Sequence, residues 1–145
     1  MLMKRYLVAY LAALIVMVSI DAIWLSVMAD RLYRPVMGDM LLPEFRLLPA
    51  MIFYLVYPVG LLFLAIRPAL REGSLTAAIL SGAVLGFTAY ATYDLTNQAT
   101  MTRWSTTLTI ADLCWGTFLS AIASGAGYRI TERLFGGSTA RGHRL

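Results

Sequence analysis

Four long apolar stretches determine what this chain can fold into. They cover residues 6–28, 47–66, 75–95 and 105–128, and each has about the 20 mainly apolar residues that a helix needs to cross a bilayer. Together they use most of the 145 residues and leave no room for a soluble domain. The sequence therefore predicts an all-α fold, a single four-transmembrane-helix bundle over residues 1–135. Residues 136–145 are rich in Gly, Ser and Arg, and we expect them to form a disordered polar tail.

The composition agrees with a membrane protein and excludes several kinds of site. Hydrophobic residues make up 59% of the chain and charged residues only 14%, against about 25% in a soluble domain. The one histidine, His143, lies in the polar tail, and the one cysteine, Cys114, lies in the fourth apolar stretch. The helices therefore offer no disulfide framework and no metal-type cysteine spacing, and we do not expect axial haem ligation or a His-based zinc site within them. We expect no cofactor and no metal, and we expect Cys114 to be a small core or lipid-facing residue.

The distribution of positive charge predicts the orientation in the membrane. Eight basic residues lie on one side of the predicted spans and four on the other, so the net charge of +4 is a topology signal and not a nucleic-acid footprint. The positive-inside rule then places both termini in the cytoplasm. The larger set is Lys4, Arg5, Arg67, Arg71, Arg129, Arg133, Arg141 and Arg144, and the smaller set is Arg31, Arg34, Arg46 and Arg103.

The first apolar stretch resembles a signal peptide because Lys4 and Arg5 precede it. However, it is longer than the usual core of about 7–15 residues, and it contains Asp21 and Trp24. We therefore favour a retained first helix over a cleaved signal. The following residues, 30–46, predict an ordered outer loop with an interfacial turn of helix around residues 36–42.

Prolines and small residues divide the remaining chain. Pro58 predicts a kink in the second span, either for packing or to form a pocket. Pro68 predicts that this helix ends at Arg67, and Ser74 is a good N-cap for the third helix. Two stripes of small residues favour close helix packing, within one chain by default or between two chains. They are Ala78, Gly82 and Gly86 in the third span and Gly116, Ser120 and Ser124 in the fourth.

Three acidic residues, Asp21, Asp94 and Asp112, lie inside or at the end of the apolar stretches. A carboxylate at membrane depth costs roughly 2.5–3.5 kcal/mol on insertion scales, so it normally faces a protein interior or a wet cavity and often marks a functional site. A rise of about 1.5 Å per residue places Asp21 and Asp112 at one level, each about 6 Å to the outer side of the midplane. Asp94 lies nearer the outer end of the third span.

Aromatic and polar residues gather at the same depth and predict an aromatic-walled pocket that opens outward. The predicted ligand-binding residues are Asp21, Trp24, Tyr90, Tyr93, Asp94, Asn97, Asp112 and Trp115. A structural interpretation stays open for several of them. Tyr and Trp are enriched at membrane interfaces, and Trp104 is more typical of an interfacial anchor than of a ligand contact. Asp94 can cap its helix or pair with Arg103, and Asp21 and Asp112 can form a structural hydrogen-bond network.

Several of these residues also carry a family resemblance. The motif Tyr93-Asp94-Leu95-Thr96-Asn97, within residues 90–100, resembles the DUF2177 family of predicted bacterial membrane proteins, and the resemblance covers residues 15–128. It implies an integral protein of the bacterial cytoplasmic (inner) membrane, multi-pass, and brings no established activity. The same pattern includes Asp21, Trp24 and Leu25, Tyr33, Arg34 and Pro35, Gly38, Phe53 and Tyr54, Arg67, Pro68 and Ala69, Trp104, and residues 112–117.

Three functions follow from these features. The first is a membrane protein that binds a lipid or another small molecule, with the lipid bilayer as its surroundings and no nucleic-acid partner. The second is a proton- or cation-coupled transporter or channel, which four helices can form only as a homo-oligomer. The third is an accessory subunit of a membrane complex. Enzymatic activity through carboxylate acid–base chemistry stays open, but the sequence has no recognised nucleophile–base pair or phosphate loop.

Overall fold

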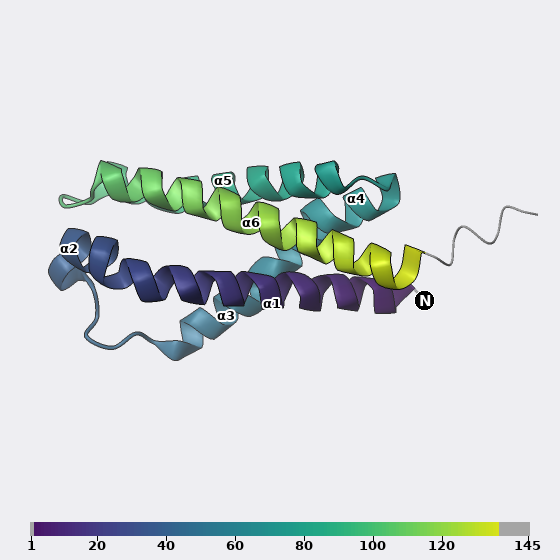
Figure 1. The fold of residues 1–145 in the computed structure, drawn as a ribbon. Helices are drawn as coiled ribbons and strands as arrows, with labels where there is room; N and C mark the ends of the chain where they lie inside the picture. Colours follow the sequence, from purple (N-terminus) through teal and green to yellow (C-terminus); the bar gives the residue numbers. More distant parts are fainter. Residues whose placement is uncertain (1, 137–145) are drawn as a thin grey trace, which may run out of the picture.

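The structure is a computed structural model that describes residues 2–136, and these residues form a bundle of helices (Figure 1). Four helical segments within this range are long and apolar enough to cross a membrane. The segments are Leu2–Met40, Leu47–Glu72, Leu75–Thr100 and Thr106–Phe135. The predicted all-α, four-span fold is therefore confirmed. The predicted polar tail lies outside the described residues, except for Gly136.

The first two segments each combine several helical types. The first consists of α1 (Leu2–Met28), the π-helix η1 (Ala29–Tyr33), α2 (Arg34–Met37) and the 3-10 helix η2 (Gly38–Met40). The second consists of α3 (Leu47–Leu61), the π-helix η3 (Leu62–Ile66) and α4 (Arg67–Glu72). The third and fourth segments are single helices, α5 (Leu75–Thr100) and α6 (Thr106–Phe135).

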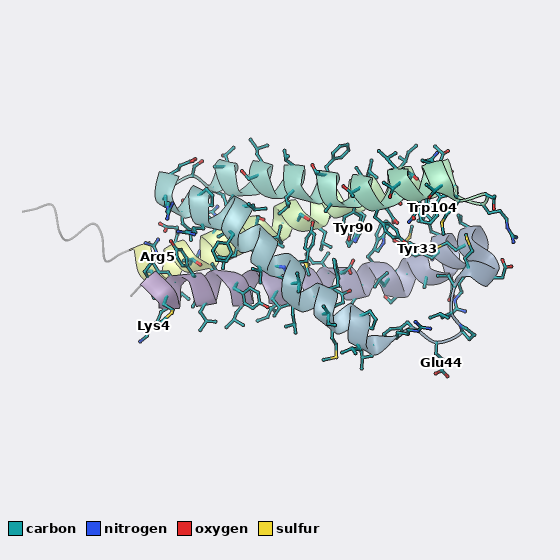
Figure 2. All side chains as sticks on the ribbon, turned by 180° about the vertical axis from the view of Figure 1, so that it is seen from behind. Lys4, Arg5, Tyr33, Glu44, Tyr90 and Trp104 are labelled. Carbon is teal, nitrogen blue, oxygen red and sulfur yellow. The ribbon has the colours of Figure 1, made fainter. Side chains whose placement is uncertain are left out.

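The long helices α1, α5 and α6 run along the bundle, and α3 crosses behind α1 at an oblique angle (Figure 1). The start of α1, the end of α6 and α4 lie at one end of the bundle, which we call the terminal end. The opposite end holds α2 and the connection between α5 and α6, and we call it the α2 end. Figure 2 shows Lys4 and Arg5 at the terminal end and Tyr33 and Trp104 towards the α2 end, with Tyr90 between them.

Small residues bring α5 and α6 into close contact. A Cβ atom added to Gly82 would lie 2.6 Å from the carbonyl oxygen of Ser120, and one added to Gly86 would overlap the carbonyl oxygen of Gly116. Because no side chain fits in these places, the two backbones approach as closely as helices do at small-residue interfaces in membranes. The predicted stripes of the third and fourth spans therefore meet each other within one chain.

The second segment does not end at Arg67, so that prediction was wrong. Pro68 lies at the start of α4 directly after the wider π-turn of η3, and the helical segment continues past it. The segment ends instead at Gly73, which has a φ of 69° in the left-handed region that favours glycine. Ser74 then caps α5 as predicted, because its hydroxyl accepts a hydrogen bond from the Ala77 amide at 3.1 Å.

The predicted outer loop of residues 30–46 begins as a continuation of the first helix. The π-helix η1 adds a residue to one turn, and Leu32 in it is buried. An ion pair of 2.8 Å between Asp30 and Arg34 lies along this turn. The expected interfacial turn near residues 36–42 is present as α2 and η2. As a consequence Tyr33 belongs to the bundle and not to a loop.

A fully buried apolar layer fills the bundle on the terminal side of Asp21. It includes Met17, which lies one turn before Asp21 on α1, together with residues from α3, η3 and α6. Large apolar side chains such as Ile15, Leu80 and Phe118 are exposed on the outside, as expected for helices surrounded by lipid. The apolar layer consists of Ala13, Met17, Leu61, Ile66 and Leu119.

Candidate functional site

The carboxylate of Asp21 connects three spans. It lies on α1, is only 6% exposed, and accepts a hydrogen bond of 2.8 Å from the Trp115 indole nitrogen on α6. Its second oxygen accepts a hydrogen bond of 2.6 Å from the Tyr54 hydroxyl on α3. Since both donors are neutral, they lower the cost of burying the carboxylate without cancelling its charge.

Asp112 on α6 is held in a matching way by the first segment. It is also 6% exposed, and it accepts a hydrogen bond of 2.6 Å from the Tyr33 hydroxyl. That hydroxyl in turn accepts a hydrogen bond of 3.1 Å from the Trp24 indole nitrogen. The rings of Trp24 and Trp115 stack with centroids 4.2 Å apart and planes within 9°. The first and the fourth segment therefore each supply one carboxylate and one indole to a connected network.

Asp94 differs from the other two acids because it has no hydrogen-bond partner. Its residue is 0% exposed, and neither carboxylate oxygen has a partner among the described residues. It lies on α5, close enough to Asp112 for the two charges to interact. The alternative pairing with Arg103 is absent, since Arg103 lies 3.5 Å from Asp39 and both are exposed. Asp94 is thus a buried acid with neither a hydrogen-bond donor nor a counter-charge among the described residues.

No basic side chain among residues 2–136 forms an ion pair with any of these three acids. The ion pairs of the described chain are Arg5–Glu132, Arg34–Asp30 and Arg103–Asp39. The site therefore combines up to three negative charges with neutral donors only. We call it the carboxylate cluster, and it consists of Asp21, Asp94, Asp112, Trp24, Tyr33, Tyr54 and Trp115.

The remaining predicted residues lie around this cluster at different distances from it. Tyr90 is half-buried, and its ring occupies the space where Gly116 has no side chain. Tyr93 is 56% exposed, and its ring centroid lies 5.7 Å from that of Trp104 with the two planes at 74°. Asn97 is half-buried one turn further towards the α2 end. The structure thus connects Asp21, Trp24, Asp112 and Trp115, with Asp112 joined to Trp24 through the Tyr33 hydroxyl, and leaves Tyr93 and Asn97 at the edge.

Two members of the cluster, Tyr33 and Tyr54, were not among the predicted site residues. Tyr33 falls within the predicted outer loop, because a π-turn that continues a helix has no clear sequence pattern. Tyr54 had a usable signal, since Tyr54 and Tyr57 lie three residues apart and share one helix face in the outer half of the second span. Both residues donate hydrogen bonds to the carboxylates, so they complete the site.

Two apolar grooves lie along α3 next to the cluster. They have volumes of about 470 and 450 Å³, and Tyr57 lines both of them. The hydroxyl of Tyr57 shares a hydrogen bond of 2.8 Å with Ser120 on α6. The first groove is lined by Leu55, Val56, Tyr57, Val59, Gly60 and Leu85, and the second by Leu48, Pro49, Ile52, Phe53, Val56 and Tyr57. No member of the carboxylate cluster lines either groove, and Tyr57, which lies one turn after Tyr54 on α3, is the residue that links both grooves to the interior of the bundle.

Comparison with known proteins gives one match. A family model described as predicted membrane protein (DUF2177) matches residues 6–129, which include every member of the carboxylate cluster. No curated protein and no solved structure matches the chain. Since the matched range covers most of the sequence, the chain belongs to the DUF2177 family of predicted membrane proteins.

Proposed function

We propose that this membrane protein binds an amine-bearing lipid or small molecule at the carboxylate cluster. The observation that carries the proposal is the state of Asp94, which is fully buried with both oxygens unpartnered. An ionised carboxylate is costly to bury unless it is paired, and unpaired acids inside membrane proteins commonly mark sites for substrates or ions. A positively charged group of a ligand would supply the charge that the described residues do not provide.

The aromatic members of the cluster suit the same class of ligand. The faces of Trp and Tyr rings attract cations, and a desolvated ammonium group gains about 2 kcal/mol from such a contact. The stacked Trp24 and Trp115 lie between the two hydrogen-bonded carboxylates, and Tyr90 lies on the α5 side. A ligand amine near Asp94 would therefore meet negative charge and aromatic faces together.

The grooves along α3 favour a ligand with an apolar portion. Tyr57 lines both grooves and reaches Ser120 in the bundle, while Tyr54, one turn away, holds Asp21. An acyl chain in a groove would leave the amine end near the carboxylates. Under the predicted topology the α2 end faces outward, so the ligand would enter from the outer leaflet.

The proton- or cation-relay alternative has less support. A relay needs titratable groups on both sides of the cluster, but on the terminal side the buried polar side chains of α6 are the hydroxyls of Ser120, Ser124 and Thr131, which do not titrate. The accessory-subunit alternative explains Asp21, whose contacts join three spans, as a device for helix pairing. It does not explain Asp94, which makes no hydrogen bond to another helix.

Analysis of molecules that purify with the protein tests the proposal. The full chain would be extracted in mild detergent, and its bound molecules would be identified by mass spectrometry for the native sequence and for Asp94→Asn. Asp30→Asn is a matched control, because Asp30 is exposed and lies outside the cluster. We expect an amine-bearing molecule to be enriched with the native protein and the control and lost from Asp94→Asn. Identical contents in all three samples would contradict the proposal.

A further inference from the structure

A second charged side chain without a counter-charge lies at the terminal end. Arg67, the first residue of α4, is half-buried, and its Nε atom is buried without a hydrogen-bond partner. No described residue forms an ion pair with it. Its guanidinium instead lies over the rings of Tyr6 and Phe63, 5.6 Å from each centroid. Two aromatic faces thus fix the guanidinium while its anion-binding capacity is unused.

The close packing of three segments positions this arginine. Gly127 on α6 allows the close approach, since a Cβ there would lie 2.7 Å from the Ile66 side chain and 3.0 Å from the Ala9 carbonyl oxygen. Ile66, the residue before Arg67, is therefore fixed against α1 and α6. The Arg67 side chain consequently has a defined place between the first and second segments, unlike a surface arginine that moves freely in solvent.

Arg5 adds a second incompletely satisfied guanidinium at this end. One of its terminal nitrogens lies 2.6 Å from the Glu132 carboxylate, but its Nε is buried without a partner. Of these two guanidiniums, Arg5 has one acidic partner and Arg67 has none among the described residues. Among the described residues, the cations of this end outnumber its acids by six to two. They are Lys4, Arg5, Arg67, Arg71, Arg129 and Arg133, against Glu72 and Glu132.

We propose that Arg67 binds the phosphate of an anionic phospholipid headgroup, with Arg5 adding positive charge at the same end of the bundle. A guanidinium presents a planar fork that fits phosphate oxygens, and such charge-assisted contacts are roughly twice as strong as neutral hydrogen bonds. Basic pockets between membrane helices bind anionic lipid headgroups in this way. Arg67 lies five residues before the end of the second segment at Glu72, and Phe63 under the guanidinium is 52% exposed on the outside of the bundle. An acyl chain can therefore continue along Phe63, which favours a lipid over free phosphate.

This site is independent of the ligand proposed for the carboxylate cluster, because it lies at the opposite end of the bundle and shares no residue with it. Native mass spectrometry of the full chain with phosphatidylglycerol, phosphatidylcholine or inorganic phosphate tests it. Arg67→Gln removes the guanidinium. Arg71→Gln is the matched control, since Arg71 is exposed on the same helix and its substitution removes the same charge. Arg67→Lys keeps the charge without the fork.

We expect the native protein and Arg71→Gln to retain phosphatidylglycerol about tenfold better than phosphatidylcholine, the loss of one bidentate contact being of this size. Arg67→Gln is expected to lose this preference, and Arg67→Lys to keep only part of it. If Arg67→Gln does not fold, Arg67→Lys alone decides, and full retention by it would overturn the proposal. Equal losses in Arg67→Gln and Arg71→Gln, no preference in the native protein, or displacement of the lipid by inorganic phosphate would each overturn it as well.

Discussion

The indole nitrogen of Trp115 donates a hydrogen bond of 2.8 Å to the carboxylate of Asp21 and so joins the fourth span to the first. Tyr54 adds the second span through the other carboxylate oxygen at 2.6 Å. Polar contacts between membrane helices are worth about 0.6–2 kcal/mol each, so two contacts at one residue contribute appreciably to the specific arrangement of helices. Asp21 therefore has a structural role in addition to its place in the cluster.

Replacement of Asp21 by alanine should destabilise the bundle. The change leaves the Trp115 and Tyr54 donors without their acceptor, and one unsatisfied buried donor costs about 1–3 kcal/mol. We expect the free energy of unfolding to fall by about this amount or more in Asp21→Ala and by less in Asp21→Asn, which keeps an acceptor oxygen. Equilibrium unfolding in mixed micelles measures both values. Asp30→Ala is the control, and an Asp21→Ala protein as stable as this control would refute the structural role.

The contact between α5 and α6 should not tolerate a methyl group. A Cβ on Gly86 overlaps the backbone oxygen of Gly116, and backbone cannot move aside as a flexible side chain does. Overpacking of this kind costs about 1–3 kcal/mol. We expect Gly86→Ala to lower the midpoint of thermal unfolding clearly. Gly60→Ala provides the comparison, since its nearest neighbour lies at an ordinary 3.9 Å, and similar midpoints for the two variants would disprove the close packing.

Residue patterns predicted the spans and the two small-residue stripes because apolar length and the spacing of glycines are direct consequences of helix geometry. The same patterns could not predict the π-helices η1 and η3, whose wider turns depend on tertiary packing. Tyr33 shows the effect on the site, since the turn that brings it to Asp112 is one of these. Asp94 shows a second limit. Its position near the end of a span allows pairing with Arg103 as one alternative. Which partner a carboxylate meets is decided by the neighbouring helices, and Arg103 pairs with Asp39 instead.

The predicted orientation can be tested with single cysteines. Eight of the twelve basic residues lie at the terminal end or in the tail, so we expect this end in the cytoplasm. Cys114 would first be replaced by serine, and Asp39→Cys or Glu72→Cys would then be added, since Asp39 and Glu72 are both exposed and lie at opposite ends. A membrane-impermeant maleimide applied to intact cells should label Asp39→Cys only. Labelling of Glu72→Cys alone would contradict this orientation and place the terminal end outside.

Recognition of a ligand amine at Asp94 can be tested with two probes that share one apolar chain and end in an ammonium or a hydroxyl group. Dodecylamine and dodecanol have the same apolar chain, and their binding to the purified full chain can be followed by the shift in the midpoint of thermal unfolding. We expect a larger stabilisation by dodecylamine in the native protein and in Asp30→Asn. In Asp94→Asn, which keeps the size of the side chain, we expect the two probes to act equally. Equal effects in the native protein, or a preference for the amine that survives Asp94→Asn, would contradict recognition of an amine at Asp94.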